Sequence, residues 1–193
     1  HSIGAIGARG GGVCDHFNVN PNDIDILMGT FTKSFGAVGG YICSNKDLIQ
    51  HLKSNCSGSL YSASISPPAC QQVISAMEII LGEDGTALGQ SKIKNLKKNA
   101  NYFRQKMQLM GCHTLGDYDS PIIPTMLYNP AKIPAFSREC LKRGLAVVVV
   151  GFPASPLLLS RARFCISAAH TKKDLDDALE KIDQVCSLLG IKY

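Results

Sequence analysis

Short apolar runs alternate with longer stretches of helical periodicity along most of this chain, and that alternation limits the folds open to it. Apolar residues spaced three and four apart predict helices, and continuous apolar runs predict strands. The predicted strands are 24–31, 39–44, 121–128, 145–150 and 161–168, and the predicted helices are 46–53, 67–81, 93–110, 131–143 and 171–189. Strands interleaved with helices indicate the α/β class. We expect the strands 24–31 and 145–150 to be buried.

The turn Gly82-Glu83-Asp84-Gly85 breaks the pattern between two predicted helices. Glycine and acidic residues in a cluster end helices and mark turns. We therefore predict one domain in residues 1–85, and a connecting helix with a smaller α/β domain in residues 86–193. A chain of 193 residues is long enough to bury a sizeable core.

Composition excludes several partners. The net charge is +5, but the lysines do not form a run, so we expect no nucleic-acid partner. Those at 92, 94, 97 and 98 fall on one predicted helix and are interpreted as its solvated face. No apolar run reaches about 18 residues, so this stretch is not expected to span a membrane. Any membrane association would come from parts outside this chain or from partner proteins.

Eight cysteines are many for this length, but their spacing contains no C-x-x-C pair and no metal-type pairing with histidine. We therefore predict no metal site. Cys43, Cys140 and Cys165 lie in apolar surroundings, so we interpret them as reduced core residues of a protein that faces the cytosol.

The segment Gly29-Thr30-Phe31-Thr32-Lys33-Ser34-Phe35-Gly36 carries the strongest chemical signal. It places one lysine among hydroxyls and glycines directly after a strand-like run. A lysine that is desolvated loses its charge more easily, and its free amine attacks aldehydes. The hydroxyls and glycines suit a bound phosphate. These features together favour a Schiff base with pyridoxal phosphate.

Two other interpretations of this lysine remain. Most lysines at strand ends are solvated surface residues. The pair Lys33-Ser34 also resembles the end of a nucleotide-binding loop, but that loop needs glycine at the positions held by Thr32 and Leu27.

The segment 29–41, GTFTKSFGAVGGY, resembles the cofactor-lysine signature of the α-oxoamine synthases. Two later segments, 147–156 (VVVVGFPASP) and 160–171 (SRARFCISAAHT), resemble the same family in the same order. The resemblance implies a fold of the aspartate-aminotransferase type (fold type I), of which this chain would be a fragment. It would hold the end of the large domain and the small C-terminal domain.

The resemblance assigns roles to four residues. Lys33 would hold pyridoxal phosphate and then transfer protons, and Thr30 would bind its phosphate. His1 matches the histidine of the family's D-E-A-H segment, which contacts the phenolic oxygen of the cofactor. Arg163 would clamp the substrate carboxylate, since a planar guanidinium can make two parallel hydrogen bonds. A structural ion pair is the alternative for Arg163, and a backbone-capping hydroxyl is the alternative for Thr30.

Members that resemble these segments most condense L-serine with a long-chain acyl-CoA to give 3-ketosphinganine. The resemblance further implies a related non-catalytic subunit as partner and a place on the cytosolic face of the endoplasmic reticulum membrane. Ala63 stands where relatives usually have threonine, and this fits a partner that carries no cofactor. The alternatives are a relative that uses glycine or alanine, such as 5-aminolevulinate synthase, and a non-catalytic scaffold subunit. Lys33 argues against the scaffold.

Overall fold

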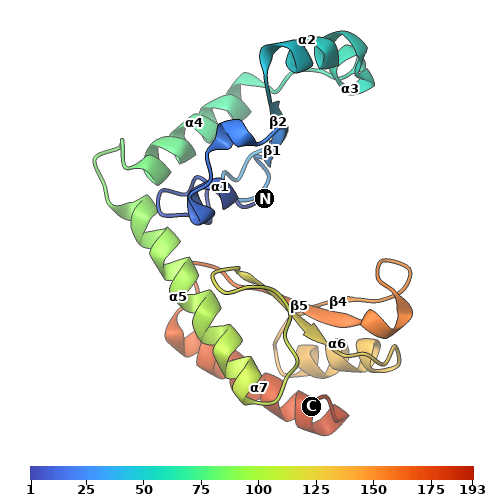
Figure 1. Cartoon of the computed structure of the whole chain (residues 1–193). Helices are drawn as coiled ribbons and strands as arrows, with labels where there is room; N and C mark the ends of the chain where they lie inside the picture. The colour runs from blue at the N-terminus through green and yellow to red at the C-terminus, as the bar shows by residue number, and fades with distance from the viewer. The chain divides into compact units, whose positions relative to one another are not determined.

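The computed structural model describes all 193 residues, which form two compact units, 1–93 and 94–193 (Figure 1). The division falls within the helix α5 (Leu88–Leu109), which therefore contributes residues to both units. The predicted boundary after Gly85 lies shortly before this helix. The equivalence of the two units to the predicted domains stays a prediction.

Unit 1 combines a two-stranded antiparallel ribbon with short helices. Strand β1 (Leu27–Thr30) pairs with β2 (Gly40–Cys43), with Leu27 opposite Cys43 and Thr30 opposite Gly40. Both strands are shorter than predicted. The helices are α1 (Val13–Phe17), η1 (Pro21–Asp23), α2 (Lys46–Asn55), α3 (Ser57–Tyr61) and α4 (Pro67–Leu81). The predicted helix 67–81 is confirmed, with a proline in its first turn and Gly82 in the left-handed conformation after its end.

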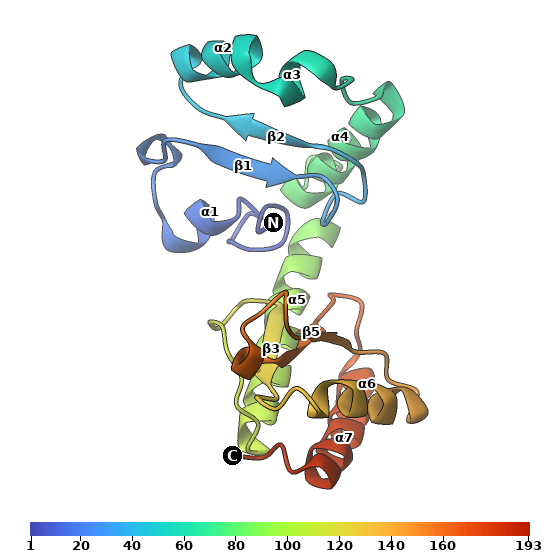
Figure 2. The same ribbon diagram turned by 90° about the vertical axis from the view of Figure 1, so that its right-hand side faces the viewer.

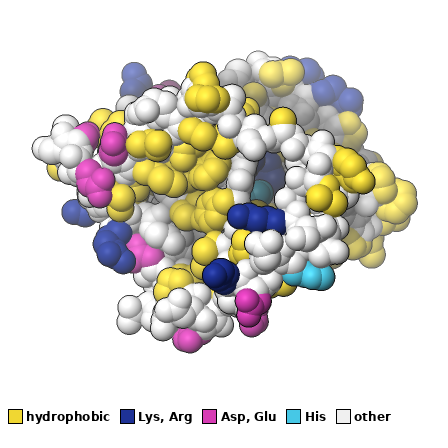
Figure 3. All heavy atoms as spheres, turned by 90° about the horizontal axis from the view of Figure 1, so that it is seen from above, with side chains coloured by type: hydrophobic (Ala, Val, Ile, Leu, Met, Phe, Trp, Pro, Cys, Tyr) yellow, Lys and Arg dark blue, Asp and Glu magenta, His cyan; other side chains and the backbone are white.

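The prediction of a buried strand at 24–31 is wrong. Ile26 and Met28 are 52% and 64% exposed. The reason is that β1 has β2 as its only partner strand, so most side chains of the ribbon stay open. Hydrophobic side chains also gather on the face that is seen from above in Figure 3.

Helix α5 begins in close contact with the end of α4. A Cβ atom added to Gly89 would lie 2.1 Å from the carbonyl oxygen of Ile79, so only glycine permits this approach. The side-chain amide of Gln90 donates to the carbonyl of Ile80 at 3.0 Å and holds the two helices together.

Unit 2 is built on a three-stranded antiparallel sheet in the order β3-β5-β4 (Figure 2). Its elements are β3 (Ile122–Met126), α6 (Lys132–Lys142), β4 (Val148–Val150), η2 (Leu157–Leu159), β5 (Arg161–Cys165) and α7 (Lys172–Leu189). The helix predicted to begin after Thr171 is confirmed. Its capping box joins the Thr171 hydroxyl to the Asp174 amide and the Asp174 carboxylate to the Thr171 amide.

Helices α5, α6 and α7 and one face of the sheet enclose a continuous core. Ala162 and Phe164 of β5 face this core, with Phe103 of α5, Phe136 of α6 and Ile182 of α7. The intervening side chains of β5 point to the opposite face, as the alternation of a strand requires.

The buried strand predicted at 145–150 is also wrong. The strand covers Val148–Val150 only, and Val148 is 53% exposed. Val148 lies opposite Arg163 of β5, on the sheet face that the helices do not cover, whereas Val149 packs against the core.

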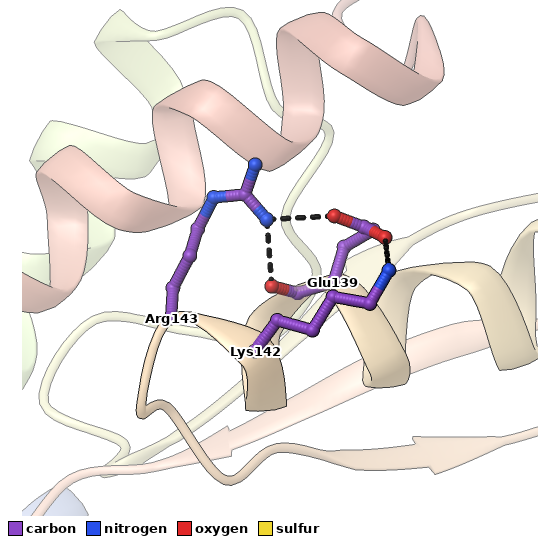
Figure 4. A network of polar contacts seen from close by, with 3 residues as sticks. All are labelled: Glu139, Lys142 and Arg143. Carbon is purple, nitrogen blue, oxygen red and sulfur yellow. Dashed lines mark hydrogen bonds and ion pairs between the residues drawn. The ribbon is translucent and has the colours of Figure 1, made fainter.

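Two charged groups fix loops and helix ends in unit 2. Arg104 of α5 is fully buried and donates to the backbone carbonyls of Leu115, Gly116, Ser120 and Ile122 at 2.6–3.4 Å. On the last turn of α6, the Glu139 carboxylate accepts from Lys142 at 2.7 Å and from Arg143 at 2.8 Å (Figure 4). The first arrangement ties a loop to the core, and the second lies near the surface.

The cysteine prediction is partly wrong. Cys140 is buried, but Cys43 and Cys165 are exposed: Cys43 is the last residue of β2, and Cys165 lies on the open face of β5. The lysines at 92, 94, 97 and 98 are exposed as predicted. None of the helices has both the length and the apolar character that a membrane span requires.

Candidate functional site

Lys33 lies in a closed loop, residues 31–39, that joins β1 to β2. The Phe31 amide donates to the Gly39 carbonyl at 3.0 Å, and the Ala37 amide donates to the Phe31 carbonyl at 2.9 Å. A further bond joins the Gly36 amide to the carbonyl of Lys33 itself at 3.2 Å. These backbone bonds fix the lysine at the end of the ribbon. We call residues 31–39 the lysine loop.

Phe35 attaches the lysine loop to unit 1. Its side chain is buried, and its ring lies edge-on to Phe31 with centroids 5.6 Å apart. Its carbonyl accepts from the side-chain amide of Gln72 on α4 at 3.2 Å. Sequence reasoning missed both anchors, although an aromatic residue two positions after the lysine was a usable signal.

The side chain of Lys33 itself is exposed. The expectation of a desolvated lysine is therefore wrong for unit 1 as it stands, because the neighbouring Gly36, Thr32 and Ser34 are too small to cover a side chain of that length. The amine makes no ion pair, so no carboxylate of unit 1 competes with a ligand for it.

Thr30 lies at the end of β1 and bonds within its own loop. Its hydroxyl is 2.8 Å from that of Thr32 and also contacts the Gly39 carbonyl at 3.3 Å. These contacts match the backbone-capping alternative, but they also place two hydroxyls side by side next to Lys33. A hydroxyl pair of this kind can turn its protons toward an anion.

The N-terminal glycine-rich segment lies against the lysine loop. A Cβ atom added to Gly4 would lie 2.6 Å from the Cβ atom of Ser34. Gly4 is held in turn by its amide, which donates to the Gly10 carbonyl at 2.7 Å. His1 is three positions before Gly4 and is exposed. The structure thus brings the N-terminal segment close to the lysine loop, while the role of His1 stays a prediction.

Tyr41 is a site neighbour that sequence reasoning missed. It stands opposite Gly29 in the ribbon, and a Cβ atom on Gly29 would lie 2.3 Å from the tyrosine ring. Burial raises the pKa of the Tyr41 hydroxyl. The glycine that begins the lysine signature therefore makes room for an aromatic ring, and a glycine inside a strand is the signal that could have found it.

Arg163 belongs to unit 2. It stands on the central strand β5, between Pro124 of β3 and Val148 of β4, on the face that the helices do not cover. It is exposed and forms no ion pair, so the alternative of a structural ion pair finds no support. Arg161 shares this face, as the alternation of the strand predicts.

Arg163 also lines a cavity of about 340 Å³ in unit 2. The walls are mostly apolar and come from the segment before β4 and from α7. His170 and Asp174 are polar members of the lining. The imidazole of His170 accepts from the Ser167 amide at 3.2 Å, and Asn99 donates to the carbonyls of both residues. His170 thus stabilises its own turn.

The family model described as aminotransferase class I and II matches residues 1–182 of the chain. The chain is 60% identical to long chain base biosynthesis protein 2a of Oryza sativa subsp. japonica and 53% identical to serine palmitoyltransferase 2 of Dictyostelium discoideum. Each alignment covers the whole chain but 40% and 39% of those relatives, so the chain spans about two fifths of their length.

A solved structure of SPT (serine palmitoyltransferase) with a PLP internal aldimine superimposes with a TM-score of 0.86 at 26% identity. The superposition covers 99% of this chain and 46% of that one. These matches confirm the predicted fold of the aspartate-aminotransferase type. The chain belongs to the aminotransferase class I and II family.

Proposed function

We propose that this chain is part of a pyridoxal-phosphate enzyme that condenses L-serine with a long-chain acyl-CoA, giving 3-ketosphinganine, CoA and CO2. The observation that carries the proposal is the lysine loop, which presents an unpaired primary amine beside two hydroxyls on a backbone-bonded turn. Relatives named for serine palmitoyltransferase and for long chain base biosynthesis support the choice of substrates.

The groups of the lysine loop fit pyridoxal phosphate chemically. The cofactor needs an amine for its aldehyde and donors for its phosphate, and Lys33 with Thr30 and Thr32 offers both. When bound, the cofactor supplies the electron sink that stabilises a carbanion at the α-carbon of the amino acid. The protein supplies position and charge.

Lys33 has two tasks in this proposal. Its amine would hold the cofactor by the aldehyde group, and its exposed position would leave room for the amine of the substrate. Its Nζ atom would also accept and return the proton at the α-carbon of the substrate. The closed lysine loop limits the motion of the lysine backbone, so the amine returns to the same place in each turnover.

Arg163 binds the carboxylate of the amino acid. The guanidinium has no carboxylate partner in unit 2, so its five N–H donors remain available for a bidentate pair. Pro124 and Val148 beside it in the sheet cannot compete for those donors, because neither carries a polar side chain.

A related non-catalytic subunit and the cytosolic face of the endoplasmic reticulum membrane belong to the same proposal. Residues 53–68, which include Ala63, are exposed throughout, so this segment is free to meet a partner chain. Purifying the native complex and counting pyridoxal phosphate per heterodimer tests the first point. One cofactor per pair supports it, and two contradict it. Fractionation of cells with a tagged protein tests the location.

The decisive experiment uses the native complex loaded with pyridoxal phosphate and reduced with borohydride. Trypsin cleaves after Lys33 when its amine is free and gives peptides 10–33 and 34–46. We expect a single peptide 10–46 that carries the pyridoxyl mass, because a modified lysine resists cleavage. Lys53→Arg is the matched control, since Lys53 is another exposed lysine of unit 1.

The Lys33→Arg variant should lose the label and Lys53→Arg should keep it. A folded complex without label at Lys33 would overturn the proposal and favour the scaffold alternative. A panel of serine, glycine and alanine with palmitoyl-CoA then separates the substrates. Turnover with glycine in preference to serine would favour an enzyme of the 5-aminolevulinate synthase type.

A further inference from the structure

Two buried thiols meet in unit 2, and neither belongs to the residues proposed to bind cofactor and substrate. The Sγ atoms of Cys112 and Cys186 are 3.5 Å apart, although the residues stand 74 positions apart in the sequence. Cys112 follows the end of α5, and Cys186 lies in the last turns of α7. The proposed function uses neither thiol.

The surroundings hold the pair in place. The Cys186 carbonyl accepts from the Ile191 amide at 2.9 Å, and the Tyr193 amide donates to the Gly111 carbonyl at 2.7 Å. The C-terminal residues therefore pass from one cysteine to the neighbour of the other. A disulfide needs a sulfur–sulfur distance of about 2.05 Å, so the two sulfurs must approach by about 1.5 Å. A change of side-chain rotamer and a small shift of the helix end can supply this.

The two thiols differ in reactivity. One S–H hydrogen bond joins the two sulfurs, and this bond together with the nearby Lys192 ammonium lowers the pKa of Cys112. The hydrogen bond with Cys112 and burial both raise the pKa of Cys186. Cys112 is 4% exposed and Cys186 is 0% exposed. Cys112 is thus the more accessible and the more acidic sulfur of the pair.

We propose that Cys112 and Cys186 are a redox modification site, which a hydroperoxide such as hydrogen peroxide converts to a reversible disulfide. The Cys112 thiolate attacks one peroxide oxygen, the O–O bond breaks, and sulfenic acid and one water are formed. The Cys186 sulfur then attacks the sulfenic sulfur, the S–O bond breaks, and a second water leaves with the Cys186 proton. Two thiols and one peroxide give one disulfide and two waters, with two electrons passing from sulfur to oxygen.

The test treats the native protein with hydrogen peroxide, blocks remaining thiols with N-ethylmaleimide during unfolding, and digests with trypsin without reductant. We expect tryptic peptides 107–132 and 182–192 to be joined, with the loss of two hydrogens, and dithiothreitol to separate them. The cross-link should also raise the thermal unfolding midpoint by about 5 °C or more, since it closes a long loop.

Three variants make the test specific. Cys112→Ala and Cys186→Ala should each lose the joined peptides and the rise in midpoint. Cys140→Ala is the matched control: Cys140 is also fully buried, and burial raises the pKa of its thiol to about 11. This variant should keep the cross-link, and far-ultraviolet circular dichroism should show that all three fold.

Exposed Cys43 reports whether the oxidant has acted. If Cys43 is oxidised and peptides 107–132 and 182–192 stay separate, the proposal is wrong and the pair only fills the core. A disulfide that joins Cys140 to either residue would also overturn it.

Discussion

The two units of the chain hold their shape by different means. Unit 2 encloses a core in which Phe103, Phe136 and Ile182 are at most 2% exposed. In unit 1 the buried large apolar side chains are Phe35, Val73 and Ile93. The lysine loop of unit 1 depends instead on backbone hydrogen bonds and on glycines that allow close approach.

This difference between the units indicates where a fold can carry an exposed reactive group. Loops carry binding and catalytic residues because their side chains need not pack in a core. The Lys33 side chain is exposed and packs in no core, so we expect a substitution there to change the reaction and not the stability. In unit 2 most buried positions are fixed by packing, and Arg163 is exposed on the sheet face that the helices leave open.

The largest expected effect separates chemistry from folding in unit 1. Lys33→Arg keeps the charge and the length but removes the primary amine, so turnover should fall by at least about 10³-fold. The thermal midpoint should not change, because the side chain is exposed and unpaired. Steady-state turnover and thermal unfolding of the native protein check both statements. Activity within tenfold of the parent would remove Lys33 from the reaction, and Lys53→Arg serves as the unaffected control.

The next effect tests the contrast between the cores. Phe136→Ala in unit 2 should cost about 3–5 kcal/mol of unfolding free energy, since Phe136 is fully buried and contacts Phe164. Phe35→Ala in unit 1 should cost less, because its partner Phe31 is only half-buried and water can fill the gap. Hydrogen exchange measured by mass spectrometry resolves the two units. Equal losses would contradict the proposed difference.

Arg104 offers a polar version of the same test. Arg104→Met fills much of the space but leaves up to four backbone carbonyls of the 115–122 loop without a donor, so unit 2 should lose about 2–4 kcal/mol. Arg138→Met, at an exposed position of α6, should change stability by less than about 0.5 kcal/mol. A denaturant titration of both variants measures the difference. Similar values would show that the buried guanidinium is dispensable.

Arg163 tests whether the open sheet face of unit 2 binds substrate. Arg163→Gln should raise the KM for serine about 10–100-fold and leave the KM for acyl-CoA unchanged, because it removes charge-assisted bonds to the carboxylate alone. Arg161→Gln, on the same face, should have the smaller effect on KM. Saturation curves for both substrates decide between them, and a larger effect at Arg161 would transfer the role to that residue.

The sequence predicted what depends on local patterns. The helices around Val73 and Leu175 were found from apolar spacing. Burial of the strands was predicted wrongly at Met28 and Val148. An apolar run shows that a strand can be buried, but whether another layer covers it depends on the tertiary structure.

The site was recoverable from sequence only in part. The segment around Lys33 was found because hydroxyls, glycines and a lysine stand together in the chain. The contact of Gly29 with Tyr41 was missed because it depends on strand register, which joins residues 12 positions apart. The Cys112–Cys186 contact was missed because it joins residues 74 positions apart, and no local pattern brings the ends of α5 and α7 together.

The smallest expected effect lies on the surface of unit 2. Lys142 and Arg143 hold the pKa of Glu139 below its ordinary value of 4.5, so the folded state favours the carboxylate (Figure 4). The stabilisation is therefore present above about pH 4.5 and is lost as the pH falls through the lowered pKa. Glu139→Gln should reduce the loss of stability between neutral and acidic pH and change the neutral midpoint little, because exposed ion pairs contribute little. Thermal unfolding across this pH range measures the effect, and Glu180→Gln is the control, because Glu180 is exposed and has no cation partner. An equal response from both variants would show that the ion pairs of Glu139 with Lys142 and Arg143 do not stabilise α6.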